Sequence, residues 1–206
     1  MSEVYVITHP LVQDILARLR DKNGSNRRFR ELMKAVSGLV VAETLRDIPV
    51  RNVRVHTPLA IANGKRVSEN ITIVLIIRAG IGMLNGITNI LPEVHIGYIG
   101  MYRNEETLEP VHYYHNIPDT VRNGWTILID PMLATGGSAV AAVNLLKEKK
   151  SKHIRFLSLI SAPEGIEVLK TKHPDVNIFT AAIDKKLNKV GYIIPGLGDA
   201  GDRLFG

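Results

Sequence analysis

The sequence contains no cysteine, which excludes a disulfide framework, a thiolate zinc site and a cysteine nucleophile. It also lacks any apolar run close to the roughly 18 residues that a membrane-spanning helix needs. The first four residues show neither the basic region nor the apolar region of a secretory signal. These absences fit a reducing compartment, so we expect a cytoplasmic protein with no membrane partner.

The charge of the chain is unbalanced, with a formal net charge of +6. Basic residues gather in segments 18–30 and 147–152, where acidic residues are interleaved and aromatic residues are nearly absent. Two interpretations stay open: a surface for nucleic acid, or solvated helix faces together with a site for an anionic ligand. The interleaved acids favour the second, so we do not expect a nucleic-acid partner.

The bulk composition is that of a globular protein, with 45% hydrophobic and 22% charged residues among 206. A chain of this length can bury roughly 70% of its unfolded surface in one core. We therefore expect a single domain over residues 1–206. Its first part, over about 9–46, has apolar residues at helical spacing, with Pro10 in the first turn, and predicts an N-terminal helical appendage.

After these helices the pattern changes to short apolar runs separated by helical segments. Strands that are apolar on both faces indicate an α/β fold, a mostly parallel sheet with helices on both faces. Residues 109–117 lack helical spacing and predict a β-hairpin arm, and the glycine-rich residues 191–206 predict a loop outside the core. The predicted strands are residues 52–57, 71–77, 95–102, 125–130, 154–160 and 176–183, and the predicted helices are 82–91, 137–149 and 164–172.

One strand of this sheet is followed at once by residues suited to a phosphate. It ends at Asp130, at the carboxyl edge where open α/β sheets bind ligands. Gly136 and Gly137 let the backbone approach a ligand closely, Thr135 and Ser138 add hydroxyls, and the next helix points its positive end at the same place. An N-capped helix after a tight turn is the alternative. No Gly-Lys-Ser/Thr follows, so the loop is not that of a nucleoside triphosphatase.

Two arginines also follow predicted strands. Arg78 lies beside Gly80 and Gly82, and Arg103 follows the next strand at the base of the hairpin arm. A guanidinium group binds two oxygens at once and suits a diphosphate; a surface arginine is the alternative. Further along, the glycine-dense segment 191–203 exposes backbone donors and acceptors suited to a planar heterocycle, with a poorly ordered tail as its alternative.

These features resemble the uracil phosphoribosyltransferases, a branch of the type I phosphoribosyltransferases, from about residue 27 to the last. The most specific stretches are Asp-Pro-Met-Leu-Ala-Thr-Gly-Gly-Ser at 130–138 and Gly-Tyr-Ile-Ile-Pro-Gly-Leu-Gly-Asp-Ala-Gly-Asp at 191–202, with further similarity at 100–106 and 162–165. The resemblance implies that uracil and 5-phospho-α-D-ribose 1-diphosphate (PRPP) are converted to UMP and diphosphate with Mg²⁺. It also implies a homo-oligomer, a dimer or tetramer, and for some members a GTP effector.

The resemblance assigns roles to particular residues. It implies that the donor PRPP is held by Arg78, Arg103, Asp130, Pro131, Met132, Leu133, Ala134, Thr135, Gly136, Gly137, Ser138 and Asp199. It implies that uracil is read by Tyr192, Ile193, Gly198, Asp199 and Ala200. We expect Asp130, Asp199 and Arg103 to act in catalysis. No protein residues have the spacing of a metal site, so Mg²⁺ is expected on the donor's diphosphate.

Two details of the resemblance lead to expectations. The wider superfamily has two adjacent acids where this chain has Asp130 and Pro131, so we expect Asp199 to lie near the ribose and supply the missing charge. Related transferases also turn the backbone with a non-proline cis peptide, which we expect within residues 77–80. Two alternatives remain from the sequence: an RNA-binding pyrimidine regulator on the same fold, and a transferase for a purine or orotate.

Overall fold

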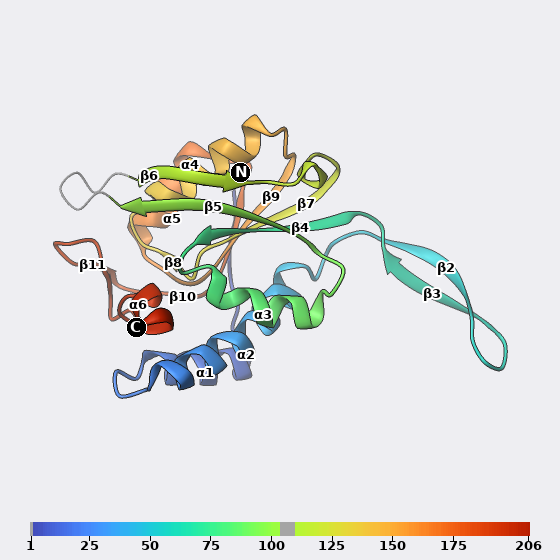
Figure 1. The fold of residues 1–206 in the computed structure, drawn as a ribbon, viewed down its shortest axis with the longest axis horizontal. Coiled ribbons are helices and arrows are strands. Elements are labelled where there is room, and N and C mark those ends of the chain that lie inside the picture. The colour runs from blue at the N-terminus through green and yellow to red at the C-terminus, as the bar shows by residue number, and fades with distance from the viewer. Residues whose placement is uncertain (1, 104–109) are drawn as a thin grey trace.

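The computed structural model describes residues 2–103 and 110–206, without the side chain of Arg103. Its centre is an eight-stranded sheet (Figure 1) in which the strands are parallel except for the antiparallel pair β5 and β6. In spatial order the strands are β1 (Val4–Val6), β10 (Asn177–Ile183), β9 (His153–Ser161), β7 (Gly124–Ile129), β4 (Asn70–Ile77), β5 (His95–Arg103) and β6 (Pro110–Asn116), and β8 (Met132–Leu133) also pairs with β9.

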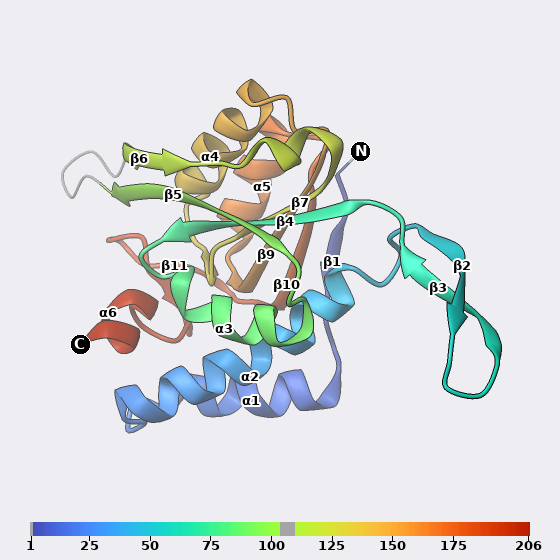
Figure 2. The same ribbon diagram turned by 45° about the vertical axis from the view of Figure 1, so that its right-hand side comes forward.

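Helices cover both faces of this sheet (Figure 2). One face carries α1 (Pro10–Arg20), α2 (Asn26–Thr44), α3 (Ile81–Ile90) and α6 (Ala200–Phe205), and the other carries α4 (Gly137–Glu148) and α5 (Pro163–Lys172). The alternation along β4 shows why both layers form. Ile73 and Leu75 are buried in the core on the α2 side, and Val74 and Ile76 in the core on the α4 side. A strand with two apolar faces is stable only between two helical layers.

The α/β sheet and its helices confirm the predicted fold class. Five of the six predicted sheet strands and all the predicted helices are present, with ends within two residues of those expected. The predicted hairpin arm at 109–117 is confirmed in part: β6 pairs antiparallel with β5, but it is the edge strand of the central sheet and not an arm. Residues 104–109 lie outside the described residues. No helix in the described part of the chain is long and apolar enough to cross a membrane.

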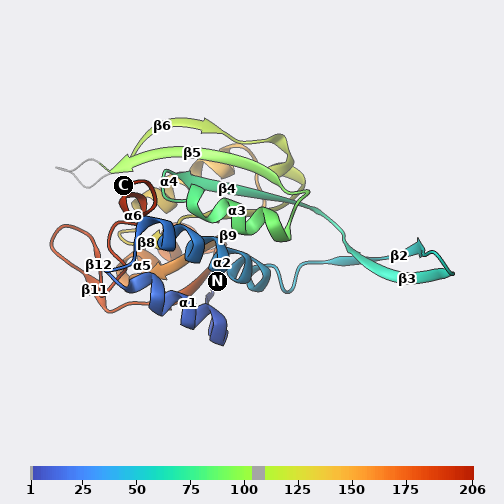
Figure 3. The same ribbon diagram turned by 60° about the horizontal axis from the view of Figure 1, so that its bottom comes forward.

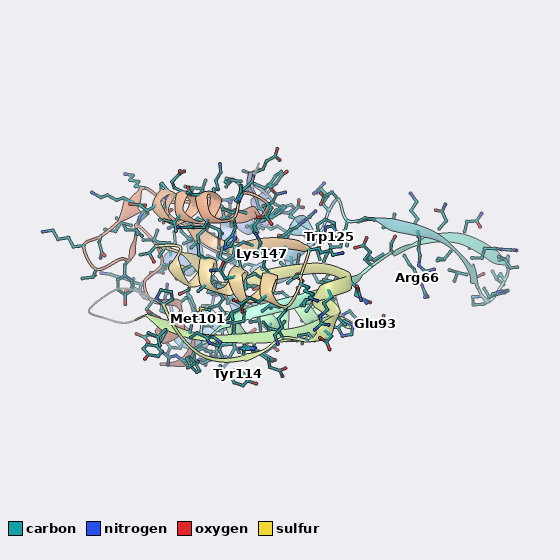
Figure 4. All side chains as sticks on the ribbon, turned by 90° about the horizontal axis from the view of Figure 1, so that it is seen from above. Arg66, Glu93, Met101, Tyr114, Trp125 and Lys147 are labelled. Atoms are coloured by element: carbon teal, nitrogen blue, oxygen red, sulfur yellow. The ribbon has the colours of Figure 1, made fainter. Side chains whose placement is uncertain are left out.

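The prediction that residues 52–57 form a strand of the sheet is wrong. These residues belong to β2 (Val50–His56), which pairs only with β3 (Ile61–Val67). The resulting hairpin extends away from the body of the molecule (Figure 3), and Arg66, labelled in Figure 4, lies near its base, where it pairs with Arg51. Six of the seven residues in each of its strands are exposed, as in a ribbon open to solvent on both sides, and Leu59 at its tip is 96% exposed.

The prediction that residues 191–206 stay outside the core is also wrong. The chain ends in α6, where Asp199 caps the helix by accepting a hydrogen bond from the Asp202 amide at 2.9 Å. Leu204 is buried against α3, and a Cβ atom at Gly82 would lie 2.5 Å from its methyl group. A six-residue helix is too short to give a periodic signal in the sequence. Strand β1, with three residues, is shorter still and was not predicted.

Candidate functional site

A cleft of about 740 Å³ opens at the carboxyl edge of the sheet. Its lining comes from three parts of the chain: Ala79 after β4, residues within 130–139 after β7, and residues within 189–201 near the C-terminus. The segment predicted to hold phosphate and the segment predicted to hold a base therefore face each other across one space. This is the place where parallel α/β sheets bind their ligands.

The loop after β7 has the geometry of an anion site. Asp130 accepts a hydrogen bond from the Met132 amide at 3.1 Å, which turns the chain at the strand's end. Gly136 has a φ of +84°, and α4 begins at Gly137 with no side chain capping it. The first amides of a helix have no partners within the helix and carry its positive end, so a phosphate group fits here.

Two glycines hold this loop against α5. A Cβ atom at Gly136 would lie 2.9 Å from the carbonyl oxygen of Gly165, and one at Gly165 would lie 2.4 Å from that of Ala134. Both distances are shorter than real contacts, so neither position admits a side chain without a shift of backbone. Segment 162–165, one of the stretches that resemble the family, thus packs directly against the loop after β7.

A second cavity, of about 320 Å³, adjoins the cleft and contains Arg78. The two spaces share five lining residues, among them Asp130, Ser138 and Asp199. The peptide bond Ile77–Arg78 is cis, which confirms the expectation for this turn. The Arg78 guanidinium lies 3.8 Å from the Asp202 carboxylate, with both side chains largely exposed. A guanidinium group at this position suits an anion that would extend from the cleft into the cavity.

The predicted site residues are distributed as follows. Of the predicted donor residues, Pro131 and Gly137 do not line either space, and Arg78 lines only the second. Arg103 ends β5, but its side chain lies outside the described residues. All the predicted base-reading residues line the main cleft: Tyr192, Ile193, Gly198, Asp199 and Ala200.

The segment predicted to read the base has a defined backbone path. Its strand β12 (Ile193–Ile194) pairs with β11 (Lys186–Leu187), and a cis bond joins Ile194 to Pro195. Left-handed φ values of +61° at Gly196 and +80° at Gly198 follow, which favour glycine at both positions. This part of the backbone lines the same cleft as the loop after β7.

Sequence reasoning missed the residues that hold this segment in place. Arg20 donates two hydrogen bonds of 2.7 Å to the Asp184 carboxylate and one of 2.8 Å to the carbonyl oxygen of Gly196. Asp184 also accepts a hydrogen bond from the Gly196 amide at 2.7 Å. Arg203 stacks over Phe29, with 4.3 Å from its guanidinium carbon to the ring centre. Only the basic composition of residues 18–30 hinted at such partners.

The carboxyl group of Asp184 has a lowered pKa. Burial raises its pKa, but the hydrogen bonds from Arg20 and Gly196 and the charge of Arg20 outweigh burial, so the net direction is down. A carboxyl group with a lower pKa in the folded state stabilises the fold above its unfolded pKa, about 3.9. That stabilisation is lost as the pH falls through the folded value.

We expect Asp184→Asn to lower the free energy of unfolding by about 2 kcal/mol at neutral pH, because it leaves Arg20 half-buried without its charged partner. Thermal unfolding measured from pH 7 downward should show the two proteins converging below pH about 4. Asp14→Asn is the matched control, since its ion pair with Arg18 is half-exposed on both sides. An unchanged difference between wild type and Asp184→Asn at all pH values would contradict the assignment.

The chain is similar to known proteins over nearly its whole length. Residues 6–206 match the profile of the family described as uracil phosphoribosyltransferase. A uracil phosphoribosyltransferase of Dictyoglomus turgidum is 54% identical over 204 residues, 98% of this chain and 99% of that protein. The structure of an Aquifex aeolicus protein aligns with a TM-score of 0.94 at 34% identity, over 98% of this chain and 97% of the other.

A more distant structure shares the fold. The adenine phosphoribosyl transferase of Trypanosoma brucei, solved with AMP, pyrophosphate and ribose-5-phosphate, aligns with a TM-score of 0.59 at 12% identity. The alignment covers 89% of this chain and 84% of that one. The likeness at this identity concerns the arrangement of sheet and helices alone.

Proposed function

The chain belongs to the uracil phosphoribosyltransferase family, and we propose that the cleft at the carboxyl edge of its sheet is where it holds both substrates. The activity is a pentosyltransfer, in which the phosphoribosyl group of PRPP passes to uracil and gives UMP and diphosphate. The observation that carries the proposal is the single cleft in which the loop of residues 130–138 faces residues 191–201.

We assign the 5-phosphate of the ribose to the start of α4. The amides after Gly136 and the hydroxyls of Thr135 and Ser138 supply donors, and the helix supplies positive potential. The diphosphate of PRPP then extends toward Arg78 in the adjoining cavity. Uracil takes the opposite wall, against Ile193 and residues 198–200.

The chemistry needs positioning and charge rather than a protein nucleophile. The bond from the anomeric carbon to the diphosphate oxygen breaks, the bond to uracil N1 forms, and the N1 proton is released. Positive charge develops on the ribose as the diphosphate departs. Asp130 and Asp199, which line both spaces, lie where their negative charge would favour that ribosyl cation.

We propose that Mg²⁺ binds together with the donor. No group of three or more ligating side chains is present among the described residues, and two carboxylates, Asp130 and Asp199, line the cleft. This donor set fits an ion that keeps oxygen ligands from diphosphate and water. When bound, the ion would help to neutralise the negative charge of the departing diphosphate.

The assembly and the regulation of the enzyme are also proposals. We propose a homo-oligomer, because the projecting β2–β3 hairpin exposes Val55, Leu59 and Ile61, which a second copy could cover. The GTP effector is proposed from the resemblance alone. Use of the basic helices for RNA is not favoured, since Arg20 and Arg30 donate hydrogen bonds to the C-terminal segment instead.

Turnover with a panel of free bases and PRPP tests the proposed substrate. We expect UMP and diphosphate with uracil, and a rate at least about a hundredfold lower with cytosine. An amine in place of the 4-oxo group leaves a buried polar partner unpaired, which discriminates by orders of magnitude. Hypoxanthine, adenine and orotate serve as controls for other transferases of this fold. Comparable turnover on cytosine or hypoxanthine would contradict the assignment of residues 191–201 to uracil.

A further inference from the structure

Tyr113 of β6 occupies the space that a side chain at position 100 would take. A Cβ atom built on Gly100 of β5 would lie 2.6 Å from the ring atoms Cε2 and Cζ of Tyr113 and 3.0 Å from its hydroxyl oxygen. Ordinary contacts of a Cβ atom are 3.4 Å or more. The missing side chain at Gly100 therefore admits the tyrosine ring against the strand.

This placement puts Tyr113 in the wall of the Arg78 cavity. Tyr113 and Tyr102 line that space together with Arg78, Asp130 and Asp199. The ring centres of the two tyrosines are 6.3 Å apart. One side of the cavity is thus aromatic, with Arg78 among its other lining residues.

The strand that carries Tyr113 starts beside the phosphate loop. A Cβ atom at Gly137, the first residue of α4, would lie 3.2 Å from the ring of Pro110, the first residue of β6. β6 thus begins beside the assigned 5-phosphate site and continues to the Arg78 cavity. A donor molecule bound as proposed above, from the loop to Arg78, would pass along this strand.

We propose that Tyr113 contacts the diphosphate of the donor, with its hydroxyl donating a hydrogen bond to a diphosphate oxygen. The inference rests on the proposed function and adds a residue to it. Arg78 can face only part of a diphosphate, which has oxygens on all sides. A neutral donor in the same cavity can bind a second set of oxygens.

Binding of inorganic diphosphate with Mg²⁺ to the intact protein, measured by calorimetry, tests this contact. Tyr113→Phe removes only the hydroxyl, and we expect a Kd about tenfold higher, the scale of one hydrogen bond to a charged group. Tyr114→Phe is the matched control: it lies on the same strand, is 47% exposed against 54% for Tyr113, and lines neither cavity. Figure 4 shows Tyr114 at the outer margin of the molecule.

Gly100→Ala gives an independent second variant, because its methyl group displaces the ring and leaves the hydroxyl chemically intact. It should weaken diphosphate binding in the same direction, while the KM for uracil stays within about twofold in both variants. If Tyr113→Phe binds diphosphate as tightly as the wild type does, the proposed hydrogen bond is overturned, whatever the affinity of Gly100→Ala. Failure of the proposed function is distinguishable, since the wild-type protein itself would then form no UMP.

Discussion

Asp199→Asn is expected to lower kcat by roughly a hundredfold or more, about 2.7 kcal/mol in barrier, with the KM for uracil little changed. The substitution keeps the shape of the side chain and removes its charge. Asp199 lines both the main cleft and the Arg78 cavity, on the wall opposite the phosphate loop. Pro131 offers neither a charge nor an amide donor, so Asp199 is our candidate for the second acid beside the ribose.

The structural role of Asp199 can be separated from the catalytic one. Its carboxylate caps α6 through the Asp202 amide, and asparagine caps a helix about as well as aspartate. Asp199→Asn should therefore keep the thermal stability of the wild type. Asp199→Ala loses the cap as well and should cost about 1 kcal/mol of stability. Near-normal kcat in Asp199→Asn would identify the residue as a helix cap alone.

Gly136→Ala is expected to lower kcat/KM for PRPP by about a hundredfold. Two effects act together: a left-handed φ costs alanine roughly 1–2 kcal/mol, and the new methyl group meets the Gly165 carbonyl oxygen at 2.9 Å. The loop must then shift, and a displacement of about 1 Å in a binding group can reduce the rate by that factor. Steady-state kinetics with PRPP as the varied substrate measures the loss.

Gly64→Ala is the control for the loop variant. Gly64 lies in β3 of the projecting hairpin, where a Cβ atom meets only side-chain atoms at 3.6 and 3.7 Å. We expect its kcat/KM to stay within about twofold of wild type. Equal activity of Gly136→Ala and wild type would show that binding of the donor's phosphate does not depend on the shape of this loop.

Features carried by local sequence could be predicted. Five strands with two apolar faces specify a buried parallel sheet, and Asp130 followed by two glycines marks the strand end where a ligand binds. The cis turn at Arg78 was expected from related transferases rather than from the residues themselves. Each of these features could be predicted from a short stretch of chain, either from its own residues or from its resemblance to related transferases.

Features that depend on distant partners could not be predicted. Residues 52–57 have the composition of a strand, and only the absence of a packing partner for β2 distinguishes a projecting hairpin from a strand of the sheet. The pairing of Arg20 with Asp184 joins residues 164 positions apart, so neither residue stands out from its surroundings. The position of the Tyr113 ring likewise depends on a residue of the neighbouring strand, because Gly100 has no side chain to occupy the same space.

A crystal structure of the protein with UMP and diphosphate tests the central claim most directly. The account predicts the phosphate of UMP at the amides of residues 134–138, its base against Ile193 and residues 198–200, and the diphosphate between Arg78 and Tyr113. The anomeric carbon should then face Asp130 and Asp199. A nucleotide bound with its base at the start of α4, or outside the cleft altogether, would contradict the account.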